Sequence, residues 1–320
     1  MMRLWPALLL AGCSGVQTMI GGDGRHSALF NDLFVLFLIV CGLFYAAVIA
    51  FLLAALVRRR AAGPQAGLRT GLIGWTAAVT IGLSVLIVAS FLTDRASLVS
   101  ATSALRVTVT ANQWWWDVRY DDPVPASMVR TANELHLPAG RPVVITLRSN
   151  DVIHSFWVPN LAGKQDMIPG RHTDIALVPT RSGRFRGQCA EFCGQQHARM
   201  ALDIIVEPPA RFEAWRRARL QPARAPSTPL QQAGLAYVTG RECSVCHAIA
   251  GTTANGQVAP DLTHVASRLS LGAGTFPMTR GHLYGWVADP QSAKPGNHMP
   301  TIGLESAELH AVIAYLETLT

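Results

Sequence analysis

Two long runs of apolar residues dominate the first hundred positions. Residues 33–57 and 71–92 contain no charged side chain and no histidine, and each run is long enough for a helix that crosses a hydrocarbon core of about 30 Å. The segment between them carries four arginines and no acidic residue, so the positive-inside rule predicts a cytoplasmic loop. The pattern predicts a two-helix membrane anchor over residues 13–97, with both ends outside the cytoplasm.

The apolar pattern changes to an alternation with period two after residue 98. Alternating segments at 105–110, 143–147, 174–178 and 201–206 predict strands, because successive side chains of a strand point to opposite faces. Proline and glycine pairs separate these segments, as expected of turns. Residues 98–207 are therefore predicted to form a β-sandwich or barrel.

A proline-rich stretch follows, and then a helical pattern. Residues 208–229 are basic and rich in proline, which predicts a semi-rigid linker between two domains. Residues 230–320 form a separate C-terminal domain in this scheme. Its last segment, 306–319, has helical periodicity and is predicted to pack on a helix that contains Gly234 and Tyr237.

The N-terminus has the pattern of an export signal. Arg3 precedes an apolar stretch, which ends in Leu10-Ala11-Gly12-Cys13. This ending resembles the lipobox of bacterial lipoproteins, in which the cysteine thiol carries a diacylglyceryl group. Residues 1–12 are therefore predicted to be a lipoprotein signal peptide, and Cys13 a lipidation site.

Composition and charge narrow the classes of protein. The 320 residues are 50% hydrophobic and only 15% charged, with a net charge of +7. The loop between the apolar runs and the predicted linker account for more than this excess, whereas residues 230–320 carry four cations and six acids. Basicity therefore reflects membrane topology and the linker, and a nucleic-acid partner is not expected.

Sulfur and imidazole side chains cluster near the end of the β-domain. Cys189, Cys193, His197 and Met200 fall within twelve positions, and thiolate, imidazole and thioether are the ligands of copper electron-transfer sites. Two thiolates can bridge two metals, and His154 is the candidate for the second imidazole. A disulfide between Cys189 and Cys193 would leave the histidines and Met200 without a role, and a zinc site is likewise disfavoured. Cys41, in the middle of the first apolar run, is expected to be a plain apolar-facing residue.

The C-terminal domain opens with a second motif, Cys243-Ser244-Val245-Cys246-His247. This is the pattern of covalent c-type haem attachment, in which two thiols bind the porphyrin and the histidine binds iron. A redox dithiol is the alternative, and the adjacent histidine argues against it. Met299 is a candidate for the second axial ligand, and ligation by methionine and histidine raises the haem potential, which suits electron transfer. Its rivals are Met278, His264, His282, His298 and His310.

The segment from Asp151 to Met200 resembles the binuclear copper (CuA) domain of cytochrome c oxidase subunit II, a cupredoxin-like Greek-key β-barrel. The stretches 113–116 and 164–171 resemble further parts of that family. The resemblance implies that Cys189 and Cys193 bridge two coppers. It places His154 and Met200 on one metal and His197 with the Glu191 carbonyl on the other.

The same resemblance implies two further roles and contains one departure. Trp114 stands where the family admits electrons from the donor, and the Glu191 carboxylate stands where the family reaches a magnesium at the interface with subunit I. The family commonly has a glutamate three residues before a Trp-Thr pair in the second span. Here Leu72 precedes Trp75-Thr76 at that place, which puts proton uptake through this subunit in doubt.

The C-terminal motifs resemble an all-α cytochrome c domain. The run 286–300 resembles its methionine loop, and Pro260 resembles the proline whose carbonyl oxygen accepts the other N–H of the haem-binding histidine. The order of anchor, copper barrel, linker and cytochrome is similar to subunit II of caa-type cytochrome c oxidases. This implies electron entry at haem c and transfer through CuA to the haems of subunit I, where oxygen is reduced to water.

The implied setting is the bacterial inner membrane, with both soluble domains on the periplasmic face. Expected partners are oxidase subunit I, subunit III, an external cytochrome c or other electron donor, and membrane lipid. Two alternatives stay open at this point. They are a CuA subunit of a nitric oxide reductase and a membrane-anchored lipoprotein that carries electrons alone.

Overall fold

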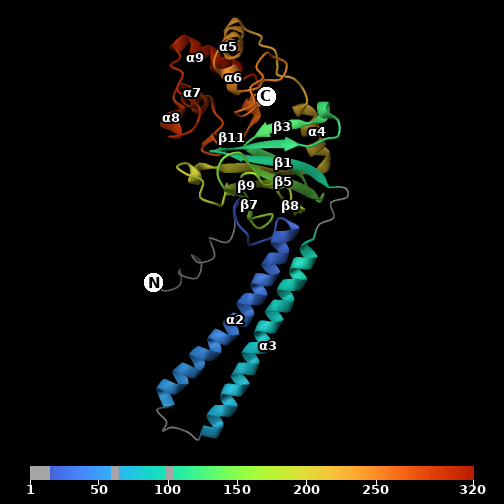
Figure 1. Cartoon of the computed structure of the whole chain (residues 1–320), viewed down its shortest axis with the longest axis vertical. Helices are drawn as coiled ribbons and strands as arrows, with labels where there is room; N and C mark the ends of the chain where they lie inside the picture. Colours follow the sequence, from blue (N-terminus) through green and yellow to red (C-terminus); the bar gives the residue numbers. More distant parts are fainter. Residues whose placement is uncertain (1–14, 59–64, 99–103) are drawn as a thin grey trace, which may run out of the picture.

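The computed structural model describes residues 15–58, 65–98 and 104–320. Figure 1 shows a long helical hairpin at one end of the molecule, a β-sandwich in the middle and a helical domain at the other end. This order confirms the predicted fold class. The predicted signal peptide (1–12) and Cys13 lie outside the described residues and stay predictions.

The hairpin consists of α2 (Arg25–Arg58) and α3 (Gln65–Ser97). Both helices are long and apolar enough to cross a membrane, and most of their apolar side chains are exposed. A water-soluble protein would bury such side chains, so the helices suit a lipid surrounding. The helices contact each other through Trp75, whose ring meets Phe44 and Phe51 edge-on at centroid distances of 5.5 and 6.1 Å.

The start of α2 is bound to the sandwich by buried polar contacts. Asp23 is buried and accepts hydrogen bonds from Arg181 (2.5 Å) and Asn160 (2.8 Å). The Ser27 hydroxyl donates to the Asn160 carbonyl oxygen at 2.5 Å. Gly24 packs so closely here that a Cβ would lie 2.6 Å from the Leu161 carbonyl oxygen. The hairpin is therefore attached directly to the β-domain.

The β-domain is a sandwich of two five-stranded sheets, which contains all four segments predicted as strands. The strand order is β3-β2-β1-β5-β8 in one sheet and β4-β10-β9-β6-β7 in the other. The pairs β1–β5 and β4–β10 are parallel, and the other neighbours are antiparallel. The strands are β1 (Leu105–Asn112), β2 (Trp115–Tyr120), β3 (Val129–Ala132), β4 (Glu134–Pro138), β5 (Val143–Ser149), β6 (His154–Trp157), β7 (Gln165–Met167), β8 (Thr173–Leu177), β9 (Gly183–Cys189) and β10 (Ala201–Glu207).

Alternation along the strands builds the sandwich core. Val107, Val109 and Ala111 of β1 are fully buried, because they share one face of a strand with period two. Trp116 on β2 is 1% exposed and meets Phe156 of β6 edge-on at 6.2 Å. This aromatic contact joins the two sheets at β6, the strand that also carries His154.

The predicted linker 208–229 is wrong in its first half. Residues Pro209–Arg219 form helix α4, which packs on the sandwich. Phe212 is fully buried, and the Trp215 ring stacks on His136 at 4.0 Å. The spacing of Phe212 and Trp215 places both on one helix face, a signal that the high arginine content of the stretch obscured. The extended linker therefore covers only the residues between α4 and α5.

The C-terminal domain is a small helical unit. Helix α5 (Pro229–Gly240) crosses α9 (Ser306–Leu316) so closely that a Cβ on Gly234 would lie 2.0 Å from the Ala311 carbonyl oxygen. This confirms the predicted packing of the last helix on the one containing Gly234. The remaining elements are α6 (Cys243–Cys246), α7 (Arg280–Ala288), α8 (Pro290–Ala293) and the short pair β11 (Ser270–Leu271) and β12 (Phe276–Pro277).

Candidate metal centre and haem-attachment site

Three separate elements of the sandwich bring the sulfur and imidazole side chains together. Cys189 is the last residue of β9, and it pairs with Phe156 of β6, two residues after His154. The chain then turns through Cys193 and a short 3-10 helix, η2 (His197–Arg199), before Met200 leads into β10. Strand pairing therefore places His154 beside a loop that is more than thirty residues away in sequence.

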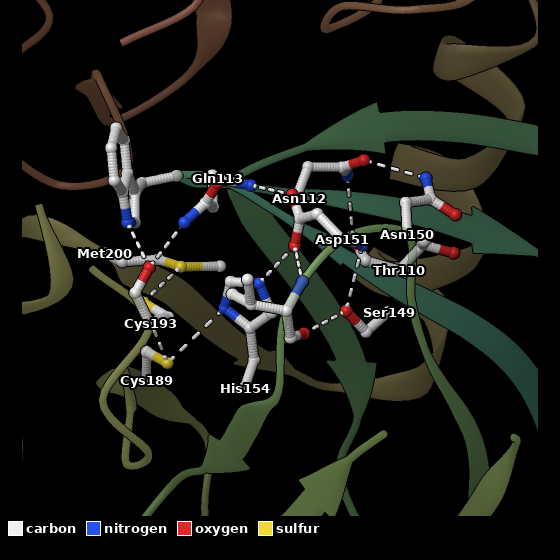
Figure 2. Close-up of polar contacts among 12 residues, drawn as sticks. Thr110, Asn112, Gln113, Ser149, Asn150, Asp151, His154, Cys189, Cys193 and Met200 are labelled. Atoms are coloured by element: carbon white, nitrogen blue, oxygen red, sulfur yellow. Dashed lines mark hydrogen bonds and ion pairs between the residues drawn. The ribbon is translucent and has the colours of Figure 1, made fainter. Parts of the chain in front are cut away.

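Figure 2 shows His154, Cys189, Cys193 and Met200 gathered at one place, and the donor atoms of His154, Cys189 and Cys193 lie within 4.8 Å of one another. The sulfur atoms of Cys189 and Cys193 are 3.7 Å apart, which is far longer than a disulfide bond of about 2.05 Å. Both cysteines are therefore free. His154 Nδ1 lies 3.7 Å from Cys189 Sγ, and His197 Nδ1 lies 3.6 Å from Cys193 Sγ. Each thiol thus has its own imidazole.

Two weaker donors complete the set. The Met200 sulfur lies 3.8 Å from Cys193 Sγ, and the Glu191 carbonyl oxygen lies 3.2 Å from Cys189 Sγ. Cys189, Cys193, His154 and Met200 are buried, so water does not compete for these positions. Two soft thiols, two imidazoles, a thioether and a carbonyl fit a copper pair in chemistry and in spacing.

The protonation of the two thiols supports metal binding. The contact with Cys193, together with His154, lowers the pKa of Cys189 to about 3 against the effect of its burial. The same contact and burial raise the pKa of Cys193. The two opposite shifts favour the thiolate form of Cys189, and the thiolate is the form of cysteine that binds a metal.

Asp151 orients the His154 ring. Its Oδ1 lies 2.7 Å from His154 Nε2, and its Oδ2 accepts a hydrogen bond from the Gln113 backbone N–H at 2.5 Å. Burial opposes ionisation, but the hydrogen bonds from His154, Val152 and Gln113 outweigh it and lower the pKa of Asp151. An ionised carboxylate on Nε2 leaves Nδ1 as the nitrogen that faces the sulfur cluster.

Trp114 packs against the loop from Cys189 to Met200, which we call the copper loop. Its indole N–H donates to the Cys193 carbonyl oxygen at 2.9 Å, and the Gln113 side chain donates to the same oxygen at 2.8 Å. The loop approaches closely at Gly194, which has a φ of +106° and where a Cβ would lie 3.1 Å from the Trp114 ring. Trp114 is 8% exposed, so its ring is buried against this loop.

Glu191 faces away from the sulfur cluster. Its carboxylate is partly exposed and lies 3.4 Å from the Lys164 ammonium, which also pairs with Asp166 at 3.3 Å. The neighbouring Phe192 is 77% exposed. This surface holds two carboxylates, Glu191 and Asp166, around one lysine, and a magnesium there stays a prediction.

The haem-attachment motif occupies one turn of helix. Cys243 and Cys246 begin and end α6, and His247 follows as its C-cap. His247 Nδ1 lies 2.6 Å from the Pro260 carbonyl oxygen, which is the contact predicted from the sequence. Burial lowers the pKa of His247, and its Nε2 is the ring nitrogen left to bind iron. The residues therefore fit a c-type haem.

The loop that carries Met299 is held by hydrogen bonds from side chains to its backbone. The Gln291 side chain donates to the Met299 carbonyl oxygen at 2.7 Å, and Asn297 accepts from the Met299 N–H at 2.8 Å. Among the rivals, His264 has both ring nitrogens within 3.1 Å of carbonyl oxygens, which leaves neither free for iron. The assignment of Met299 to the iron stays a prediction.

Comparisons with known proteins show the family of this chain. Fold and side chains define a membrane-anchored electron-transfer protein with one copper-type and one cytochrome-type domain. Residues 122–208 match the family "Cytochrome C oxidase subunit II, periplasmic domain", and residues 232–320 match the cytochrome c family. Cytochrome c oxidase subunit 2 of Alkalihalophilus pseudofirmus is 31% identical over 98% of this chain and 94% of its own length. The chain belongs to the cytochrome c oxidase subunit II family, in its caa-type form with a fused cytochrome c domain.

Other relatives cover less. Cytochrome c oxidase subunit 2 of Bacillus sp. strain PS3 is 33% identical over 67% of this chain and 62% of its own length. A crystal structure of the periplasmic domain of subunit II from Bradyrhizobium japonicum is 27% identical, with a TM-score of 0.35, and covers 38% of this chain and 96% of that one. Membership of the subunit II family, shown by the relative that covers 98% of the chain, makes this chain a subunit of an oxidoreductase complex, anchored in a membrane with a periplasmic domain. Its family implies copper, haem c and a complex with subunit I.

Three residues of the site were missed in the sequence. Asp151 precedes His154 by three positions, a short spacing that could have drawn attention to it. Gln113 adjoins the tryptophan run. Lys294 is buried and donates to the backbone carbonyl oxygens of Trp114 and Arg199 beside the copper loop. It is one of only two lysines in the chain, and no local pattern predicts that it is buried.

Proposed function

We propose that this chain is the electron-entry subunit of a terminal oxidase. It accepts electrons from an external donor at haem c and passes them through a binuclear CuA centre to the haems of subunit I, which reduces oxygen to water. When bound, the haem and the copper pair each take up and release one electron at a time. The haem would be held by Cys243, Cys246, His247 and Met299, and the copper by His154, Cys189, Glu191, Cys193, His197 and Met200.

One observation carries the proposal. The Met299 loop of the haem domain lies against the tryptophan that is hydrogen-bonded to the copper loop: the His298 and Trp114 rings are 6.3 Å apart between centroids, and Trp114 donates to the Cys193 carbonyl oxygen. Because the Trp114 ring lies between His298 of the haem domain and Cys193 of the copper loop, these contacts support Trp114 as the point where electrons enter the copper site.

The chain's own residues keep both sites ready. Asp151 holds the His154 ring, and Pro260 holds the His247 ring, each through the nitrogen that does not face the cofactor. Fixed rings need little rearrangement when the charge of the site changes, which favours rapid transfer.

The setting of the subunit is part of the proposal. Both soluble domains would face the periplasm of a bacterial inner membrane, with Cys13 lipidated. Subunit I, and subunit III beside it, would contact the membrane helices and the exposed Phe192 and Glu191, where an interface magnesium would bind. Leu72 stands where the family commonly has a glutamate, so no proton path through this subunit is part of the proposal.

The test uses the purified membrane complex. We expect an EPR signal of one unpaired electron shared by two coppers, one covalent haem c, and rapid-mixing kinetics in which haem c is reduced before copper. A copper pair reduced by the donor before the haem would overturn the order of transfer. Reduction of nitric oxide with no oxygen uptake would assign the complex to a nitric oxide reductase instead. Purification of the chain without a multi-span partner would indicate a carrier that acts alone.

A further inference from the structure

Lys294 is a buried cation at the seam between the haem domain and the copper domain. It is the C-cap of α8 and is only 2% exposed, which is rare for a lysine. Its ammonium group donates three hydrogen bonds of 2.8 Å, one each to the carbonyl oxygens of Trp114, Arg199 and Gly272. Two of these acceptors belong to the copper domain and one to the haem domain.

The three bonds satisfy every donor of the ammonium group. Burial lowers the pKa of Lys294 to about 7, which shows how dry the pocket is. The nearby Arg199 guanidinium lowers the pKa of Lys294 further, whereas hydrogen bonds to carbonyl oxygens stabilise the charged form of an amine. A buried cation that loses such partners is strongly destabilised, so the three carbonyl groups and the ammonium group hold one another in place.

Neighbouring contacts seat the same segment on the copper loop. The Gln196 side chain donates to the Pro295 carbonyl oxygen at 2.6 Å, and Arg199 donates to the Ala293 carbonyl oxygen at 3.2 Å. At Gly296, with a φ of +80°, a Cβ would lie 2.5 Å from the Gln195 side-chain oxygen. The segment of the haem domain just before Met299 is therefore built to fit the loop that carries the copper ligands.

We propose that Lys294 is a positioning residue, which fixes the haem domain on the copper domain so that the Met299 loop faces Trp114. The Lys294 ammonium group donates to the backbone of Trp114 itself. Four residues further along the chain, the His298 ring contacts the Trp114 ring. The proposal rests on the proposed function, because it concerns transfer between the two sites. Lys294 touches neither cofactor in this scheme and acts only through the seam.

The test compares two variants of the complete oxidase complex. Lys294→Met removes the ammonium group and keeps an apolar chain of similar length. Gln257→Ala is the control, because Gln257 accepts an interdomain hydrogen bond from Arg130 (2.5 Å) at an exposed edge of the seam. Copper EPR and covalent haem content show that both domains have folded.

The first readout is hydrogen exchange, which does not depend on activity. The Ala201 backbone N–H donates across the seam to the Ala273 carbonyl oxygen at 2.9 Å. We expect Lys294→Met to raise its exchange rate by about tenfold or more, because several buried hydrogen bonds to a charged group are lost. Gln257→Ala should leave that rate within about twofold of wild type, since edge contacts contribute little.

The second readout is electron transfer from haem c to copper after rapid reduction. Lys294→Met should slow this step by about tenfold, with haem reduction by the donor unchanged, and Lys294→Gln, which keeps two donors, should recover part of the rate. Unchanged exchange and unchanged transfer in Lys294→Met would overturn the proposal.

Two outcomes separate the inference from the proposed function. If wild type shows no transfer from haem to copper, the proposed function fails, and exchange at Ala201 still decides the role of Lys294. If neither Lys294 variant accumulates, exchange in wild type decides: protection of Ala201 as strong as that of the interior strands supports the proposal, and exchange near the unprotected rate refutes it.

Discussion

The two sites of this protein differ in how much of each is built by the chain itself. In the copper domain, donor atoms from strands β6 and β9 and from the loop between β9 and β10 lie within 3.2 to 3.8 Å of a neighbouring thiol, supported by a continuous core of two sheets. In the haem domain, Cys243, Cys246 and His247 are only partly buried, and Val245 and Val258 are more than 70% exposed. The β-sandwich preorganises the copper site. In the C-terminal domain, the bound haem is expected to form much of the apolar core.

The largest expected effect follows from removing the haem. A double substitution, Cys243→Ala with Cys246→Ala, should abolish covalent haem attachment and unfold the C-terminal domain, because the small core loses its largest apolar component. The copper domain should stay folded and keep its EPR signal. Haem staining after denaturing electrophoresis, proteolysis and EPR measure the three outcomes. A haem domain that stays as protease-resistant as wild type would break the comparison.

Removing a copper ligand should have the opposite pattern. Cys189→Ser should eliminate the mixed-valence copper signal, since a hydroxyl replaces a bridging thiolate. The domain should stay folded and the haem attached, because the sandwich core does not depend on the metal. Cys41→Ser is the matched control, since Cys41 is an exposed residue of the membrane helix α2. Persistence of the signal in Cys189→Ser would refute the ligand assignment.

A smaller effect should follow when only the orientation of a ligand changes. Asp151→Asn weakens the contact that holds the His154 ring, and loss of such a partner typically lowers metal affinity by about 10- to 100-fold. Copper retention against a chelator measures the change. Asp174→Asn serves as control, because Asp174 is exposed and bonds only Thr146 among the contacts described. Equal retention in the two variants would show that the ring is held by packing alone.

The smallest expected effect concerns the tryptophan between the sites. Trp114→Phe keeps an aromatic ring and removes the N–H that donates to the Cys193 carbonyl oxygen. We expect transfer from haem to copper to slow by about fivefold, corresponding to the loss of one hydrogen bond, with copper content unchanged. Trp215→Phe removes an indole N–H from the far side of the same domain and should leave the rate unaltered. An unaltered rate in Trp114→Phe would return the residue to a packing role.

Local patterns made most of the fold predictable. The hairpin, the four strands and the contact of Gly234 with the last helix each follow from periodicity within one segment. Helix α4 was missed because its arginines suggested a solvated linker, while only two apolar side chains, Phe212 and Trp215, mark its packed face. Its Arg216 is not freely solvated either, since it pairs with Asp122 at 2.5 Å. Tertiary burial by two large side chains outweighed the composition of the stretch.

The sequence alone determined the chemistry of both sites. The haem motif is contiguous, and one turn of α6 is enough to place both thiols and His247, so its spacing carries the information. Five of the six proposed copper donors likewise fall within the loop from Cys189 to Met200.

Only the tertiary structure decided which distant residues serve these sites. His154 reaches the copper loop because β6 pairs with β9, and Lys294 reaches Trp114 across 180 positions. Such contacts depend on the docking of strands and domains, which no local pattern encodes. The physical reason is that a buried histidine or lysine is stabilised by partners brought from elsewhere in the chain, and those partners exist only once the fold has formed.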